Sequence, residues 1–129
     1  MVLRNGFYTV GNSDISETQA GFRVRLNAEN FVYKAHFQNN PITPGVCLVQ
    51  MAVELFGVVK SAAVKDADFR IDTLKNVKFI APLSPMKFPE VTFTLEFTEN
   101  AIEETGGWQL KVLISENETV FAKMSMLLK

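Results

Sequence analysis

The segment that decides the fold spans residues 35–64 and reads AHFQNNPITPGVCLVQMAVELFGVVKSAAV. From about Gly45 to about Val64 this segment is apolar on nearly every side, and Pro44 stands where proline is tolerated at a helix start. We therefore predict one long helix, roughly 30 Å in length at the usual rise per residue. A helix with so wide an apolar surface is buried on most of its sides.

Segments with alternating apolar and polar residues flank this helix, and such alternation predicts half-buried strands. The strands predicted from this alternation cover residues 22–26, 91–97, 110–114 and 120–126. Residues 74–80 are predicted to form a further strand, which Pro82 and Pro85 close, and residues 31–37 are interpreted as another extended segment. Ser115 to Glu118 is predicted to be a hairpin turn, and Asn100 to Gly107 a polar loop. One long helix wrapped by a mostly antiparallel sheet is an α+β domain, and we expect a single domain over residues 1–129.

Composition narrows the function classes. The chain is 47% apolar and 21% charged with a net charge of −1, so it is an ordinary globular chain without the basic surplus that nucleic-acid binding needs. One cysteine and one histidine exclude a disulfide framework, a multi-thiolate zinc site and a histidine-rich metal site. The sequence shows no signal peptide or membrane span, so we expect a cytoplasmic protein with no membrane partner.

The loop that precedes the helix is the most informative part of the chain. Pro41 and Pro44 fix an irregular backbone, and Gly45 lets the backbone come close to a ligand at the helix start. The first amides of a helix are unpaired and carry partial positive charge, so they can stabilise a carbonyl oxygen that becomes negative during a reaction. A histidine just before this loop, His36, could act as a base beside that oxygen.

One face of the predicted helix carries a polar stripe. The residues share this face because they are three or four positions apart, and they are Cys47, Gln50, Glu54, Gly57 and Ser61. A buried carboxylate must be paired, hydrogen-bonded or protonated, so Glu54 is either part of a functional cluster or faces solvent at a subunit edge. Cys47 is interpreted as a small buried apolar residue.

The pattern His-Phe-x-x-x-Pro-x-x-Pro-Gly-Val at residues 36–46, followed by the apolar helix, resembles the β-hydroxyacyl-acyl-carrier-protein dehydratases of fatty acid synthesis. Residues 77–85, VKFIAPLSP, look like that family's Phe-x-x-Pro-x-x-Pro strand. The resemblance covers most of the chain. It implies a hot-dog fold, in which a curved antiparallel sheet wraps one long helix, and it implies removal of water from a 3-hydroxyacyl thioester.

The resemblance also implies roles for single residues. His36 matches the histidine that takes the proton next to the thioester carbonyl, and the backbone amide of Gly45 or Val46 matches the group that polarises this carbonyl. Phe37 and Pro44 belong to the same substrate-binding motif, and Phe79 would line the acyl tunnel.

The resemblance further implies the assembly and the substrate. The active site lies at a homodimer interface, with a dimer or a trimer of dimers as the assembly. The acyl group arrives as an acyl-carrier-protein or coenzyme A thioester, in fatty acid synthesis or a related specialised pathway. No metal or organic cofactor is needed.

The chain departs from this family at the acidic residue. Gln50 stands where the family has Glu or Asp, and Glu54 stands where the family usually has Gln. A neutral amide can neither donate a proton as a carboxylic acid does nor take one as a carboxylate does. Three hypotheses follow: His36 moves the proton alone while Gln50 holds the hydroxyl, Glu54 replaces the acid, or dehydration has been lost and the chain binds acyl groups or forms half of a heterodimer.

Two other classes of protein remain candidates. Hot-dog thioesterases use a carboxylate or a water-orienting residue on the same helix, and Gln50 with Glu54 could position such a water. A non-catalytic acyl-binding subunit would keep Gly45 and the tunnel but would not depend on His36. Replacing His36 by alanine separates these functions, because dehydration would collapse while acyl binding would persist.

Overall fold

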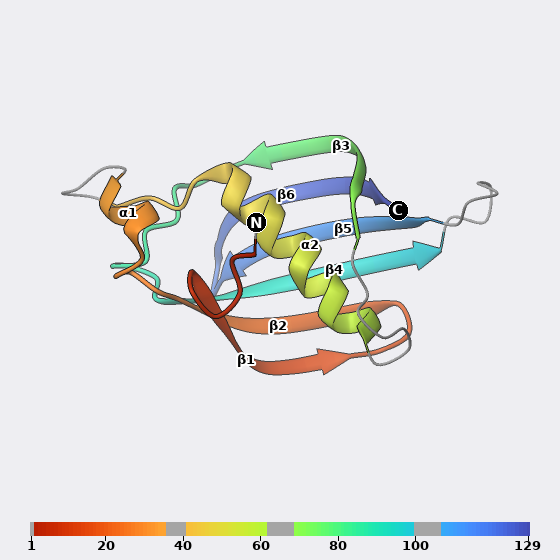
Figure 1. The fold of residues 1–129 in the computed structure, drawn as a ribbon, viewed down its shortest axis with the longest axis horizontal. Helices are drawn as coiled ribbons and strands as arrows, with labels where there is room; N and C mark the ends of the chain where they lie inside the picture. Colours follow the sequence, from red (N-terminus) through yellow and green to blue (C-terminus); the bar gives the residue numbers. More distant parts are fainter. Residues whose placement is uncertain (1, 36–40, 62–68, 100–106) are drawn as a thin grey trace.

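The structure is a computed structural model that describes residues 2–35, 41–61, 69–99 and 107–129. Its elements are, in chain order, β1 (Tyr8–Ile15), β2 (Gln19–Leu26), α1 (Phe31–Ala35), α2 (Gly45–Ser61), β3 (Ile71–Phe79), β4 (Glu90–Glu99), β5 (Trp108–Glu116) and β6 (Thr119–Leu128). The strands form one six-stranded sheet in the order β1-β2-β4-β5-β6-β3, with every neighbouring pair antiparallel. Figure 1 shows α2 crossing this sheet diagonally, so the predicted α+β architecture is confirmed.

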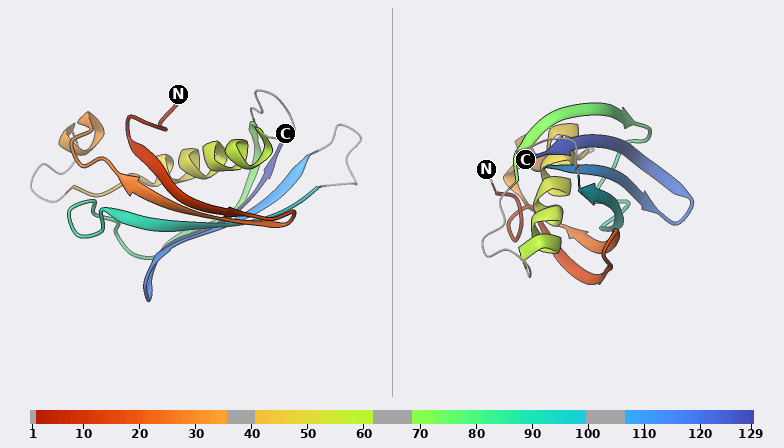
Figure 2. Two further views of the ribbon diagram at one scale, coloured as in Figure 1. Left: turned by 90° about the horizontal axis from the view of Figure 1, so that it is seen from below. Right: turned by 90° about the vertical axis from the view of Figure 1, so that its right-hand side faces the viewer.

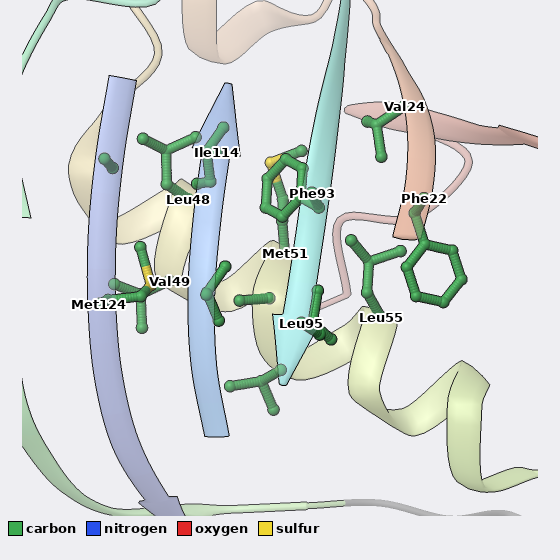
Figure 3. Close-up of a cluster of buried hydrophobic side chains, with 14 of the residues drawn as sticks. Phe22, Val24, Leu48, Val49, Met51, Leu55, Phe93, Leu95, Ile114 and Met124 are labelled. Carbon is green, nitrogen blue, oxygen red and sulfur yellow. The ribbon is translucent and has the colours of Figure 1, made fainter. Parts of the chain in front are cut away.

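The core lies between α2 and the face of the curved sheet that the helix covers (Figure 2). Met51, Ala52 and Leu55 on α2 have no exposed surface. Figure 3 shows side chains of α2 against those of four strands, among them Leu48, Met51, Leu55, Phe22, Phe93, Leu95 and Ile114. Because replacing a buried leucine by alanine removes apolar contacts and leaves a cavity, a buried leucine of α2 contributes about 2–5 kcal/mol relative to alanine.

Most of the sequence-based elements are confirmed. The five predicted strands correspond to β2, β3, β4, β5 and β6, and the predicted helix begins at Gly45 as expected. The described part of the helix ends at Ser61, and the predicted continuation to Val64 lies outside the described residues, as do residues 100–106 of the predicted loop. The hairpin turn joins β5 to β6 through Asn117, whose φ of 54° is the left-handed conformation that asparagine tolerates.

One expectation was wrong. Residues 31–35 of the segment interpreted as extended form the short helix α1 instead. Asn30 starts this helix, since its side-chain oxygen accepts the amide of Val32 at 3.0 Å, and Tyr33 anchors it by stacking on Phe7. The long helix is buried on most of its sides as expected, with Val46 at its start as an exception at 71% exposure.

The two outer strands of the sheet differ in what they leave uncovered. β1 was not predicted, because its burial pattern is mostly exposed and its sequence does not alternate. β3 occupies the opposite edge and pairs only with β6 among the described strands. Its apolar residues Leu74 and Phe79 are 46% and 56% exposed. The β3 edge therefore presents both unpaired backbone groups and apolar side chains.

Candidate functional site

A pocket of about 420 Å³ opens where the start of α2 meets the end of β3. Its walls are largely apolar and include Ile42, Pro44, Gly45, Leu48, Phe79 and Leu83. The structure thus brings together three of the predicted substrate-binding residues, since Phe79 at the end of β3 lies beside Pro44 and Gly45, from which it is far in the sequence. Val46 is not one of the lining residues, and its side chain extends into solvent.

The ring of Phe79 packs directly against Gly45. A Cβ atom at position 45 would lie 2.5 Å from Cζ of Phe79, which is closer than non-bonded carbon atoms approach one another. The space that is open because residue 45 has no side chain is therefore occupied by the Phe79 ring, and it is also the space through which a ligand would approach the backbone. Because Phe79 is 56% exposed, its ring forms an outer wall of the pocket that borders on solvent.

Hydrogen bonds hold the loop residues next to α2 in place. The amide of Thr43 donates to the carbonyl oxygen of Leu83 at 2.8 Å, and the buried hydroxyl groups of Thr43 and Tyr33 lie 2.8 Å apart. Burial raises the pKa of Tyr33 to about 12, so its hydroxyl group stays protonated. These contacts fix the chain immediately before the helix start.

The first turn of α2 folds back on Pro44, whose carbonyl oxygen accepts the amides of Cys47 and Leu48 at 3.0 and 3.2 Å. An α-helix has no intrahelical acceptor for the amides before these. At Gly45 and Val46 the helix therefore offers the positive end of its dipole beside the pocket. This is the arrangement that can stabilise a carbonyl oxygen on which negative charge develops.

One turn and two turns further along the helix, Gln50 and Glu54 lie together. Oε2 of Glu54 accepts hydrogen bonds from Nε2 of Gln50 and from the amide of Leu3, both at 2.8 Å. Oε1 accepts from the amide of Arg4 at 2.8 Å and from the hydroxyl group of Tyr8 at 2.9 Å. Each carboxylate oxygen thus has two donors, and the N-terminal segment crosses α2 at this point (Figure 1).

Tyr8 completes this cluster from the start of β1. Its side chain has no exposed surface, and burial together with the neighbouring Glu54 raises the pKa of Tyr8 far above its usual value. The hydroxyl group therefore remains a donor to Glu54 throughout the ordinary pH range. Sequence reasoning missed Tyr8, Leu3 and Arg4, because no spacing rule connects residues that far from Glu54 in the chain.

The remaining predicted site residues divide into two groups. Cys47 is 4% exposed, and burial raises the pKa of its thiol, so its interpretation as a small buried residue is confirmed. His36 and Phe37 lie outside the described residues.

Within the described ranges, no group of three histidine, cysteine, aspartate or glutamate residues could hold a metal ion. None of the described helices is long and apolar enough to cross a membrane.

Comparison with solved structures defines the fold. The chain is similar to the dehydratase heterocomplex ApeI:P from Xenorhabdus doucetiae, with a TM-score of 0.63 and 15% identity over 92% of this chain and 95% of that one. It is also similar to the conserved protein PA5202 from Pseudomonas aeruginosa, with a TM-score of 0.65 and 10% identity over 95% and 87% of the two chains. A third similar structure is a candidate thioesterase related to phenylacetic acid degradation from Ralstonia eutropha, at TM-score 0.62 and 11% identity over 94% and 83%. These likenesses establish the hot-dog fold.

The family follows from the sequence itself. The model of the ApeI-like family, described as ApeI dehydratase, matches residues 12–123. The chain therefore belongs to the ApeI-like dehydratase family, and its resemblance to a divergent hot-dog dehydratase is confirmed. A comparison with curated protein sequences gives no match.

Proposed function

We propose that this protein removes water from a 3-hydroxyacyl thioester and forms a trans-2-enoyl thioester. The observation that carries the proposal is the apolar pocket at the start of α2, whose lining residues Ile42 to Gly45 directly follow the His36 segment in the sequence. Membership of a dehydratase family supports the same reaction class. An acyl chain fits an apolar pocket with a helix N-terminus at its mouth, because the thioester carbonyl can meet the helix amides.

The reaction needs a base for a carbon-bound proton. In the proposed mechanism, His36 takes the proton from C2 of the substrate while the amides of Gly45 and Val46 stabilise the charge that develops on the thioester oxygen. The C2–C3 double bond then forms as the C3–O bond breaks. The protonated imidazole returns its proton to the departing hydroxyl group, which leaves as water. None of these steps uses a metal ion or an organic cofactor.

Gln50 takes part as a binding group in this mechanism. Its amide cannot act as an acid, but it can form hydrogen bonds with the substrate hydroxyl group and hold it in line for departure. Loss of a separate general acid slows such a reaction by about 10²–10⁴-fold and does not have to abolish it. Phe37 and Phe79 are assigned to the acyl chain, with Phe79 as the outer wall of the pocket.

The proposed active unit is a dimer. Phe79 and Ile80 are 56% and 54% exposed at the end of β3, and Val46 is exposed at the neighbouring helix start. Pairing of β3 with the same strand of a second copy would cover this edge and enclose the pocket between two subunits. The heterocomplex formed by ApeI:P supports the alternative that the second subunit is a different hot-dog chain.

The test is hydration of a trans-2-enoyl thioester, presented on acyl carrier protein and on coenzyme A, followed by loss of enoyl absorbance. We expect wild-type protein to turn over and His36→Ala to lose at least about 10²-fold in rate. Activity that survives His36→Ala would contradict the mechanism. Release of free thiol from saturated acyl thioesters would indicate a thioesterase, and acyl binding without turnover would indicate a non-catalytic or heterodimer subunit.

A further inference from the structure

Among the described residues, the hydrogen-bond partners of the Glu54 carboxylate are all donors, although the sequence pattern makes it a candidate acid. The four donors come from Gln50, Leu3, Arg4 and Tyr8, two on each oxygen. A carboxylic acid O–H in this position would point at a donor and would cost at least one of these hydrogen bonds. The geometry therefore suits a permanent acceptor and not a group that gives its proton to a substrate.

The same carboxylate sets which end of the Gln50 amide faces Glu54. A glutamine amide has a carbonyl oxygen on one side and two N–H donors on the other. A carboxylate repels a carbonyl oxygen and attracts an N–H group, so the 2.8 Å contact between Nε2 and Oε2 turns the carbonyl oxygen of Gln50 away from Glu54. Two backbone amides and a buried tyrosine hydroxyl group in turn keep the carboxylate in place.

We propose that Glu54 is a positioning residue that fixes the amide of Gln50 with its carbonyl oxygen towards the substrate, and that the N-terminal segment Leu3–Arg4 holds Glu54 in place for this purpose. The inference rests on the proposed dehydratase function. It implies that Gln50 accepts a hydrogen bond from the substrate hydroxyl group. The oxygen lone pairs of that hydroxyl group then face the protonated imidazole, which is the geometry that departure as water requires.

A double-mutant cycle separates positioning from general destabilisation. In Glu54→Gln, the new amide can donate to Gln50, which favours the opposite orientation of the Gln50 side chain. We expect Glu54→Gln to lower kcat by about tenfold or more while KM changes little, because the defect lies in orientation. In a Gln50→Ala background the same change should lower kcat by less than about twofold.

The controls isolate charge, folding and the acid role. Glu118→Gln removes one carboxylate from the exposed turn before β6 and should leave kcat unchanged. Tyr8→Phe removes one donor to Glu54 but keeps the contact between Gln50 and Glu54. The loss of stability or of kcat in this variant therefore measures the structural contribution of the cluster, separately from the orientation of Gln50. The limb of the pH profile that His36 sets should persist in Glu54→Gln, and no second limb should disappear with this change. Equal losses of kcat in the wild-type and Gln50→Ala backgrounds, or a limb of the wild-type pH profile that is lost in Glu54→Gln, would overturn the proposal.

A second measurement does not depend on turnover. In nuclear magnetic resonance spectra, one Nε2 proton of Gln50 should exchange slowly in wild-type protein and rapidly in both Glu54→Gln and Glu54→Asp, whose side chain is one methylene shorter. Rapid exchange in wild-type protein would overturn the positioning role. Failure of the wild-type protein to hydrate any enoyl thioester would instead refute the dehydratase function, and slow exchange would still establish the orientation of Gln50.

Discussion

Both tyrosines of the chain are buried and use their hydroxyl groups inside the molecule. Tyr8 donates to Glu54, and the hydroxyl group of Tyr33 lies 2.8 Å from that of Thr43. Burial is the main reason that both pKa values are raised, Tyr33 to about 12 and Tyr8 still further. The two residues therefore make the folded state sensitive to alkaline pH, although neither carries a charge near neutrality.

The sign of this effect is fixed by the direction of the shifts. A group whose pKa is raised on folding stabilises the protein fully below its unfolded pKa, and this stabilisation is lost as the pH rises towards the folded value. We therefore expect the free energy of unfolding to fall as the pH rises above about 10, where tyrosines of the unfolded chain ionise. Tyrosinate absorbance should appear together with unfolding. In Tyr8→Phe the decline should be less steep, and tyrosine ionisation near its usual pKa in the folded protein would contradict the expectation.

At the scale of elements, the contact between α2 and β3 shapes the pocket. Gly45 begins the helix and Phe79 ends the strand, and a Cβ at position 45 would displace the ring. Since this ring is half exposed, it can move outwards, and we expect Gly45→Ala to lower the free energy of unfolding by only about 1 kcal/mol. In a Phe79→Ala background this cost should disappear. Urea unfolding of the wild-type protein, the two single variants and the double variant measures this cost. An equal cost of Gly45→Ala in both backgrounds would show that the Phe79 ring is not its cause.

The elements also show what the sequence pattern can and cannot predict. The helix from Gly45 and strand β4 were predictable because burial of one surface imposes a period on apolar residues. Strand β1 was not, because an exposed edge strand has no such period. Helix α1 was interpreted as extended because Phe31 and Val32 favour strands, and its only local signal is the cap at Asn30.

The candidate site divides in the same way. The pocket residues Pro44 and Gly45 could be predicted from the loop motif, because that motif encodes a loop and a helix start as well as chemistry, and Phe79 could be predicted from the separate strand motif at residues 77–85. The environment of Glu54 could not be predicted. Its partners Leu3 and Tyr8 come from the N-terminal segment, and only the folded chain brings them to the helix. The three- and four-residue spacing along the helix identified the Glu54 carboxylate as a candidate. Its role, however, depends on N-terminal residues that no sequence spacing connects to the helix.

At the scale of the whole molecule, we expect only one of the two edges of the sheet, β3 and not β1, to form the subunit interface. Both carry an apolar side chain of similar exposure, Leu74 on β3 at 46% and Ile15 on β1 at 45%. The β3 edge lies next to the pocket and continues into the exposed residues Phe79 and Ile80, so it is the edge that the proposed dimer would use. The two residues therefore form a matched pair for testing the assembly.

We expect Leu74→Glu to convert the proposed dimer to a monomer in light scattering, because two like charges would meet across the paired strands at the cost of apolar contact. The monomer should remain folded, since Leu74 is only half buried, but its enoyl hydration should fall far more than its thermal stability. Ile15→Glu should change neither the mass nor the activity. A dimer that survives Leu74→Glu but dissociates in Ile15→Glu would place the interface on β1, and the pocket would then be complete within one chain.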